Sequence, residues 1–367
     1  MNSKRILYLD NLKNFVILLV IIHHSAHAYI FKFSNIPSPD WIIKDYASTE
    51  MWLNNILTVN MTFVMSVFFF ISGYFIPKSK QNKTKKQFIL EKAKRLLIPL
   101  LVITILFVPI YLYLKYLVID GGNLNFFEYY INIYIGHGKI SYAHGWFLMN
   151  LFIYCIIYLL FEKLIINKKI VMSVKRVLLI IFIMGLLTYL IRKIYPINTW
   201  VNALGFIGFE PAHLMQYIMM FLGGALCYQN NWLEKLTPKI GKVCSILALI
   251  MVIMLGFVDK LPSIVEQVVF GLFSFYESAM AVIMLVALIY LFRKYFNKTN
   301  RFISTISQSS YGAYIVHYTF VIALQIYFYD ISISGNLKFL FVVILSIIFS
   351  FIFSFLIKKI PRINKVI

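Results

Sequence analysis

The sequence predicts an all-α integral membrane protein: a polytopic bundle of about ten transmembrane helices with both termini in the cytoplasm. Three observations lead to this fold class. Hydrophobic residues make up 61% of the 367 residues, and charged residues only 13%. Apolar runs of about 18 or more residues, long enough to cross a bilayer as a helix, recur along the whole chain. The basic residues are also distributed unequally between successive loops, which indicates an orientation.

Ten apolar segments are predicted to span the membrane. No polar stretch between them is long enough to form a soluble domain, so we expect one membrane domain over residues 1–367. Polar residues interrupt the first segment where a signal peptide would be cleaved, and we expect that segment to be retained. The ten segments are 12–31, 56–76, 96–118, 146–166, 175–194, 213–229, 243–258, 270–292, 305–328 and 338–357.

Lys and Arg residues gather in every second loop. With ten spans, 27 of the 35 basic residues lie on the side that also holds both termini. Such an excess is typical of cytoplasmic loops, so both termini are predicted to be cytoplasmic. Attraction to anionic lipid on that side explains the net charge of +21, and we expect no nucleic-acid partner.

The three cysteines, Cys155, Cys227 and Cys244, lie in or beside apolar segments. Their spacing is not that of a disulfide framework or a zinc site. We therefore expect neither a disulfide nor a bound metal.

The first apolar segment is unusual because three histidines, His23, His24 and His27, interrupt its second half. Ionisable side chains inside a membrane-spanning helix are costly, and they indicate a functional site. Lys13 stands at the cytoplasmic end of this helix. His24 follows eleven residues later, which at a rise of 1.5 Å per residue places it about 16 Å further in, near the middle of the bilayer.

The histidines allow three interpretations. His23 and His27 are four residues apart and His24 and His27 three apart, so either pair could share a helix face and hold a metal. No carboxylate or cysteine accompanies them, which disfavours a metal. The side chains could instead bond to neighbouring helices. The third interpretation is catalysis, which the combination of a deep histidine with a basic residue at the helix mouth favours for His24.

Several motifs in order along the chain resemble those of the acyltransferase 3 family. Leu9-Asp10-Asn11-Leu12-Lys13, followed after ten residues by His24, is similar to the family's opening signature, whose usual form has Arg in place of Lys13. Other segments resemble family motifs, and the Trp146 segment is similar to the branch related to glucan-modifying proteins. These segments are Phe69–Phe75, Phe88–Pro99, Trp146–Leu148, Phe221–Gly224 and Ser310–His317.

The resemblance implies a multi-pass enzyme of a bacterial plasma membrane. Such an enzyme transfers an acyl group, usually acetyl, from cytoplasmic acyl-CoA to a hydroxyl group of an extracytoplasmic carbohydrate or glycolipid. His24 is then the expected catalytic residue, because imidazole can take the proton of a hydroxyl group near neutral pH or hold the acyl group transiently. The phosphates of the donor need basic partners on the cytoplasmic side. The candidates are Lys13, Lys92, Lys94 and Arg95.

Supporting roles are expected for a second set of residues. Glu277 lies inside the eighth span and needs a partner, with His24 as one candidate and a structural pairing as the other. Asp10 could pair with Lys13 or cap the first helix. Ser72, Trp146 and His317 belong to the motifs above. His137, His144 and Glu210 are expected on the outer side, where they could contact the acceptor.

Two other classes of function compete with this interpretation. A transporter or flippase could move a glycan or lipid-linked intermediate without covalent chemistry, and it should tolerate loss of His24 in part. A membrane scaffold would leave the histidines without a role.

Overall fold

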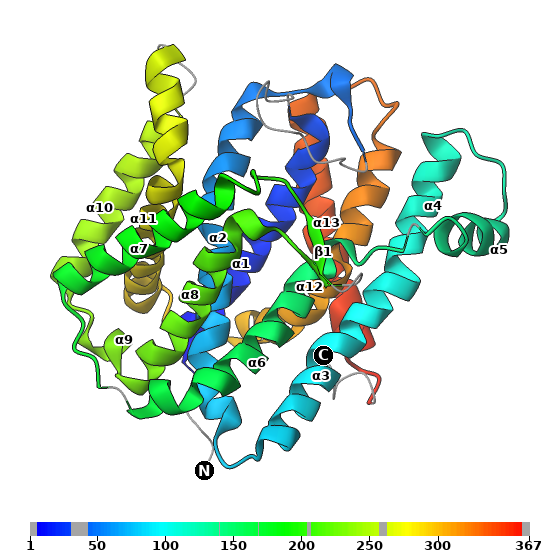
Figure 1. Cartoon of the computed structure of the whole chain (residues 1–367). Coiled ribbons are helices and arrows are strands. Elements are labelled where there is room, and N and C mark those ends of the chain that lie inside the picture. The colour runs from blue at the N-terminus through cyan, green and yellow to red at the C-terminus, as the bar shows by residue number, and fades with distance from the viewer. Residues whose placement is uncertain are drawn as a thin grey trace. The chain divides into compact units, whose positions relative to one another are not determined.

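The computed structural model describes residues 6–30, 43–138, 140–167, 169–203, 207–256 and 263–361. Helices form nearly all of the regular structure in these ranges (Figure 1). The strands β1 (Val201–Ala203) and β2 (Ile207–Phe209) pair in a short antiparallel sheet. Eight of the described helices are long and apolar enough to cross a membrane. The predicted all-α polytopic membrane fold is therefore confirmed.

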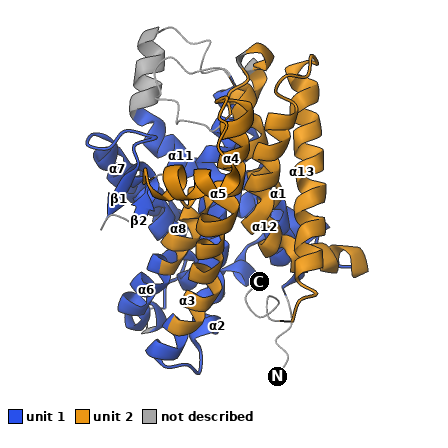
Figure 2. Cartoon of the chain, turned by 90° about the vertical axis from the view of Figure 1, so that its right-hand side faces the viewer, with its two compact units in different colours: residues 1–16, 55–89, 153–300 blue, residues 17–54, 90–152, 301–367 orange. Residues whose placement is uncertain are grey.

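The described chain divides into two compact units, which Figure 2 colours separately. Unit 1 comprises Met1–Val16, Asn55–Ile89 and Ile153–Asn300. It holds β1 and β2 and all or part of α1 (Leu7–Ala26), α2 (Met51–Lys80), α3 (Lys85–Val102), α6 (Trp146–Asn167), α7 (Val174–Arg192), α8 (Pro211–Gln229), α9 (Trp232–Lys235), α10 (Pro238–Leu255) and α11 (Ser263–Tyr295).

Unit 2 comprises Ile17–Asn54, Leu90–Phe152 and Arg301–Ile367. It holds the remainder of α1, α2, α3 and α6. Its own elements are the short helices η1 (His27–Tyr29), η2 (Tyr46–Ser48), α5 (Phe126–Glu128) and η5 (Ala143–Gly145), the π-helical segments η3 (Ile103–Phe107) and η4 (Tyr129–Ile135), and the helices α4 (Val108–Val118), α12 (Arg301–Tyr327) and α13 (Gly335–Ile357).

Each of the ten predicted spans falls on helical structure. Eight correspond to the helices that meet the length and hydropathy needed to cross a bilayer, whereas α8 and α12 are not among these. The sequence of α12 is rich in Ser, Tyr, Gln and His, which lowers its hydropathy. The count of ten spans, the single domain and the cytoplasmic termini stay predictions.

Some residues that entered those predictions lie outside the described ranges. They are the basic residues Lys4, Arg5, Lys168, Arg362 and Lys365, together with Phe31 at the end of the first predicted span and residues 257–258 of the seventh.

Two glycines let α2 and α8 approach closely in unit 1. A Cβ atom at Gly73 would lie 1.9 Å from the carbonyl oxygen of Phe221, and one at Gly224 would lie 2.2 Å from the carbonyl oxygen of Phe70. Small residues at such contacts are typical of packed membrane helices, where backbone proximity supplies the van der Waals attraction. Both glycines come from motifs noted in the sequence.

In unit 2, the start of α13 is fixed against the segment that follows the first helix. Nζ of Lys338 lies 2.7 Å from Oδ2 of Asp45, and both side chains are buried. The same ammonium group donates to the carbonyl oxygen of Tyr329. A Cβ atom at Gly335 would lie 2.0 Å from the carbonyl oxygen of Ser48. The buried ion pair and the close backbone contact together fix this end of α13.

The helix that contains η3 changes its winding just before Pro109. Proline has no N–H group, so a preceding carbonyl loses its partner within the helix. Two tyrosine hydroxyls of η4 donate to carbonyls of this stretch, Tyr134 to Thr104 at 2.6 Å and Tyr130 to Ile105 at 3.2 Å. The tyrosines thus satisfy backbone groups that the π-helical turn leaves available.

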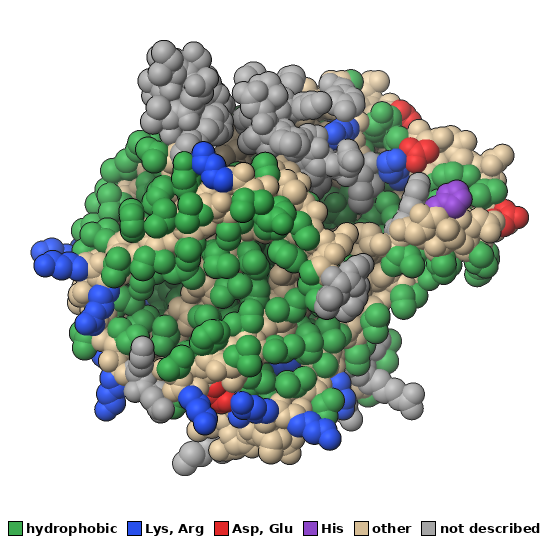
Figure 3. All heavy atoms as spheres, viewed as in Figure 1, with side chains coloured by type: hydrophobic (Ala, Val, Ile, Leu, Met, Phe, Trp, Pro, Cys, Tyr) green, Lys and Arg blue, Asp and Glu red, His purple; other side chains and the backbone are tan. Residues whose placement is uncertain are grey.

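Large apolar side chains cover the outward faces of the helices. Figure 3 shows hydrophobic side chains over α6 and α7, with Lys and Arg side chains gathered along the lower edge of that face. Leu160, Leu178 and Leu249 are 74%, 59% and 61% exposed. An apolar surface of this kind matches the hydrocarbon of a bilayer, and the basic side chains match its headgroups.

The α2–α8 contact predicts a difference between two adjacent glycines. Gly224→Ala should destabilise the protein by about 1–3 kcal/mol, because the new methyl group must displace backbone atoms. Gly223→Ala is the matched control, since a Cβ atom there meets nothing within 4 Å. Thermal unfolding of the purified variants in detergent measures both, and equal melting temperatures would contradict the packing described.

Candidate functional site

Five of the seven histidines meet in unit 2 and form one continuous chain of ring contacts. His23 and His27 lie 4.6 Å apart between ring centroids, and both contact His24 at 5.6 Å. His24 contacts His317 of α12 at 5.3 Å, and His317 contacts His144 of η5 at 4.9 Å. Residues more than 290 positions apart in the sequence thus converge on the predicted catalytic histidine. We call these five side chains the histidine cluster.

Backbone carbonyls determine the tautomers of two members of the cluster. Nδ1 of His317 lies 2.6 Å from the carbonyl oxygen of Tyr314, one turn earlier in α12. Nε2 of His144 lies 3.0 Å from the carbonyl oxygen of Ile315. A carbonyl oxygen only accepts hydrogen bonds, so each of these nitrogens carries a proton. The Tyr314 hydroxyl donates in turn to the carbonyl oxygen of His144, at 2.6 Å.

The opposite ring nitrogens are therefore available as acceptors when the rings are neutral. These are Nε2 of His317 and Nδ1 of His144, and both are buried. Among the described residues no protein group hydrogen-bonds to either atom, or to Nδ1 of His24. A buried acceptor without a partner costs about 1–3 kcal/mol. An arrangement that keeps three of them together is suited to receive a proton or a hydrogen-bond donor from a substrate.

The backbone of α1 is held in place next to this cluster. The last carbonyls of an α-helix have no partner within the helix. Nε2 of Gln325 donates to the carbonyl oxygens of His24 and Ser25, at 3.1 and 3.2 Å. The chain then tightens into η1, which begins at His27. Gln325 on α12 thus fixes the end of α1 that carries His24.

Tyr318 packs on the same group of rings. Its ring centroid lies 4.8 Å from that of His24 and 5.2 Å from that of His144. Tyr111 of α4 packs on Tyr318 at 5.5 Å.

Trp146, from the motif at the start of α6, contacts the neighbouring Phe147 at 6.4 Å. His23 and His24 are partly exposed, whereas the other three histidines of the cluster are buried.

A basic group lies around Tyr311, in the first half of α12. The Tyr311 hydroxyl donates to the carbonyl oxygen of Arg95 at 2.5 Å, and the Arg95 guanidinium lies 5.9 Å from the Tyr311 ring. Burial and the nearby Arg95 lower the pKa of Lys358, which follows α13. Of the other predicted donor-binding residues of unit 2, Lys92 is half-buried and Lys94 is exposed.

The remaining predicted residues belong to unit 1. Lys13 and Asp10 lie on the first part of α1, both half-buried, and Ser72 is half-buried near the end of α2. The start of α1 is fixed by Asn11, whose side-chain amide donates to the carbonyl oxygens of Phe296 and Lys298 at 2.6 and 3.0 Å.

Glu277, predicted to need a partner, has two in unit 1. Its Oε2 pairs with the guanidinium of Arg192 at the end of α7. Its Oε1 lies 3.1 Å from Nδ1 of His213 on α8. An ionised carboxylate only accepts hydrogen bonds, so this Nδ1 carries a proton. The three side chains are almost fully buried. Glu277 therefore makes the structural ion pair that the sequence left as the alternative to a contact with His24.

Further contacts complete this network. Nε of Arg192 donates to the carbonyl oxygen of Ala212 at 3.1 Å. On the far side of the histidine ring, Nε2 of His213 lies 3.6 Å from Oε1 of Glu210, which also accepts from the backbone N–H of Asn198. Arg192 and His213 were not singled out in the sequence. Their sequence positions could have indicated them, because each is an ionisable residue at the end of an apolar segment.

No group of three or more His, Cys, Asp or Glu side chains within the described ranges is arranged to hold a metal ion. The histidine rings contact one another in tilted and edge-to-face arrangements.

Comparison with models of protein families matches residues 6–357 to an acyltransferase domain, Acyl_transf_3. The match includes every motif on which the resemblance in the sequence was based. No curated protein and no solved structure matches the chain.

The Arg192–Glu277 pair predicts a non-additive effect on stability. Glu277→Leu should destabilise unit 1 by about 3–5 kcal/mol, because it leaves a buried guanidinium without its counter-charge. The double variant Arg192→Leu/Glu277→Leu should lose less than the sum of the two single changes. Thermal unfolding in detergent measures the difference, and strict additivity would show that the two charges do not interact.

Proposed function

The chain belongs to the acyltransferase family whose domain model it matches, and from this premise we propose that it transfers an acetyl group from cytoplasmic acyl-CoA to a hydroxyl group of an extracytoplasmic carbohydrate or glycolipid. The family makes the protein a membrane acyltransferase. The acetyl group, the CoA donor, the carbohydrate acceptor, the glucan-modifying branch and a bacterial plasma membrane are the parts that we propose.

The convergence on His24 is the observation that carries this proposal. His317 and His144 each have one nitrogen protonated and bonded to a carbonyl oxygen, and the other buried and without a hydrogen-bond partner. Gln325 holds the carbonyl oxygen of His24. A catalytic base needs such an environment, in which neighbouring groups restrict its position and leave its lone pair available.

The proposed reaction uses the imidazole of His24 as the base. His24 takes the proton of the acceptor hydroxyl as its oxygen attacks the thioester carbonyl carbon. The C–O bond forms, the C–S bond breaks, and the imidazolium returns its proton to the thiolate of CoA. The products are an ester and a free thiol, and no oxidant or metal is consumed. General-base catalysis of this kind contributes roughly 10²- to 10⁴-fold to a rate.

Basic residues are the proposed contacts of the donor. Lys92, Lys94 and Arg95 come at or just before the start of the third predicted span, and Lys13 at the start of the first. Cationic side chains form strong hydrogen bonds with phosphate oxygens. Arg95 is joined to the helix that carries His317 through its contact with Tyr311. We propose that donor phosphates bind beside Arg95, next to Tyr311 in the first half of α12.

Supporting roles are proposed for the other predicted residues. His317 would accept a hydrogen bond beside His24, and Trp146 would contact the acceptor near the start of α6. Asp10 and Ser72 would orient the first helix and the end of the second. Glu277 would hold Arg192 and His213 in unit 1.

His24→Ala should lower acyl transfer at least roughly 100-fold, since it removes the proposed base. The measurement is incorporation of labelled acetyl from acetyl-CoA into the glycan and lipid fractions of membranes that contain the variant. His23→Ala, on the same turn of α1, is the matched control and should retain most of the transfer.

Two results would contradict this assignment. Unchanged transfer by the His24 variant, at equal membrane level, would remove the catalytic role. Normal movement of a glycan intermediate without any label transfer by the wild-type protein would favour a transporter.

Lys13→Ala should raise the KM for acetyl-CoA and lower kcat/KM by roughly tenfold, the effect of losing one charge-assisted hydrogen bond. Lys13→Arg should preserve or raise activity, because the guanidinium fork binds phosphate with two hydrogen bonds. Lys78→Ala is the control, as this exposed residue is expected to contribute only to membrane orientation. The same kinetics for Lys13→Ala and wild type would exclude a phosphate contact.

A further inference from the structure

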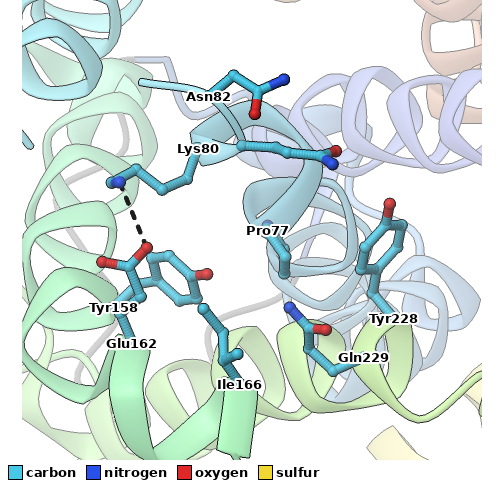
Figure 4. Close-up of a pocket in the computed structure, with 9 residues that line it drawn as sticks. Pro77, Lys80, Asn82, Tyr158, Glu162, Ile166, Tyr228 and Gln229 are labelled. Carbon is cyan, nitrogen blue, oxygen red and sulfur yellow. Dashed lines mark ion pairs between the residues drawn. The ribbon is translucent and has the colours of Figure 1, made fainter. Parts of the chain in front are cut away.

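A pocket of about 340 Å³ lies in unit 1 where three helices end (Figure 4). Its walls come from the last turns of α2, α6 and α8 and from the turn after α2. The volume is many times the roughly 30 Å³ that one water molecule occupies in the liquid, and it is at the lower end of the range for small-molecule sites. None of the residues proposed above for acyl transfer lines it. The lining residues are Pro77, Lys80, Gln81, Asn82, Tyr158, Glu162, Ile166, Tyr228 and Gln229.

The three helix ends give the pocket a negative potential. Each C-terminus presents carbonyl groups without partners in the helix and carries the negative end of the helix dipole. Glu162 adds a carboxylate that is only 16% exposed. A site of this kind favours a cation and disfavours a ligand with several phosphates. The nucleotide end of CoA is therefore a poor match.

One cationic side chain, Lys80, lines the pocket. Nζ of Lys80 is 3.4 Å from Oε1 of Glu162, and it also donates to the carbonyl oxygen of Lys83 at 2.7 Å. Gln81 and Asn82, in the turn after α2, also line the pocket and carry side-chain amide groups. Lys80 can bind a single anionic group next to the carboxylate of Glu162, which can bind a cation. The pocket thus matches a zwitterion.

Besides the charges of the pocket, the Tyr158 hydroxyl also indicates that a ligand binds there. Its side chain is buried, and within the described residues its hydroxyl has no hydrogen-bond partner. Figure 4 shows the ring beside Glu162, with the hydroxyl directed into the pocket. A buried hydroxyl without a partner is costly, and a polar group bound in the pocket would satisfy it.

The surroundings indicate a lipid. The outward face of α6 beside the pocket is apolar, with Leu160, Leu164 and Ile166 being 74%, 55% and 50% exposed. The connection from α2 to α3 belongs to the predicted cytoplasmic side, so the pocket lies at the depth of the lipid headgroups there. A headgroup in the pocket would leave its acyl chains along this face of α6.

We propose that this pocket binds the headgroup of a phospholipid with a primary ammonium group, such as phosphatidylethanolamine. The ammonium group would donate to Glu162 and Tyr158. The phosphate would accept from Lys80 and the amides of Gln81 and Asn82. Phosphatidylcholine has the same charges but no N–H donors, and phosphatidylglycerol lacks the cation.

Native mass spectrometry of the purified, delipidated protein tests the site. Titration with the dioleoyl forms of these three lipids should show the tightest binding for phosphatidylethanolamine. Glu162→Gln should weaken that binding roughly tenfold, the loss of one charge-assisted hydrogen bond. Tyr158→Phe, which keeps the ring, should weaken it by a smaller factor. Glu234→Gln, an exposed carboxylate of the same unit outside the pocket, should bind like wild type.

Three outcomes would overturn the proposal. Equal binding of phosphatidylethanolamine and phosphatidylcholine would show that the N–H groups of the ammonium do not contribute to binding. Tighter binding of phosphatidylglycerol would indicate a phosphate site only. Binding of soluble glycerophosphoethanolamine as tightly as the lipid would assign the pocket to a soluble ligand. Melting temperatures of the variants, measured without lipid, separate lost binding from lost folding.

Discussion

The cost of burying polar groups among apolar helices is the constraint on which the rest of this structure depends. Lys338 is buried because Asp45 and a carbonyl oxygen receive its hydrogen bonds. Glu277 is buried because Arg192 and His213 supply donors to both of its oxygens. The same rule applies to the backbone, since tyrosine hydroxyls of η4 take up carbonyls beside Pro109. In each unit these pairings fix where the helices pack.

In the histidine cluster, two of the rings are hydrogen-bonded through one nitrogen only. Backbone carbonyls hold one nitrogen of His317 and one of His144, which determines ring orientation and tautomer. The opposite nitrogens stay buried without a protein donor. We propose that these nitrogens take part in moving the proton of a hydroxyl group. The family to which the chain belongs supplies the reaction class that fits.

Charge separates two kinds of binding surface among the described helix ends. Beside the first half of α12, burial and the nearby Arg95 lower the pKa of Lys358, and we propose that an anion with several charges binds there. The ends of α2, α6 and α8 combine helix dipoles with Glu162 and a single lysine, and we propose that this combination binds a zwitterion. Both surfaces are on the side that the basic residues predict to be cytoplasmic. The net positive charge of the chain is therefore distributed unevenly, and the local potential differs between the two surfaces.

The apolar runs by themselves determined the helical membrane fold, because a bilayer accepts only segments whose backbone bonds are satisfied internally. The spacing of Lys13 and His24 and the motifs that follow determined the family. Only the tertiary structure decided which residues surround His24. His144, Gln325 and Tyr318 are 120 to about 300 positions away in the sequence, and the hydrophobic pattern of a membrane helix does not encode its lateral neighbours. The partners of Glu277 were undecided for the same reason: a helix that is apolar on all sides gives no sign of the face that meets Arg192.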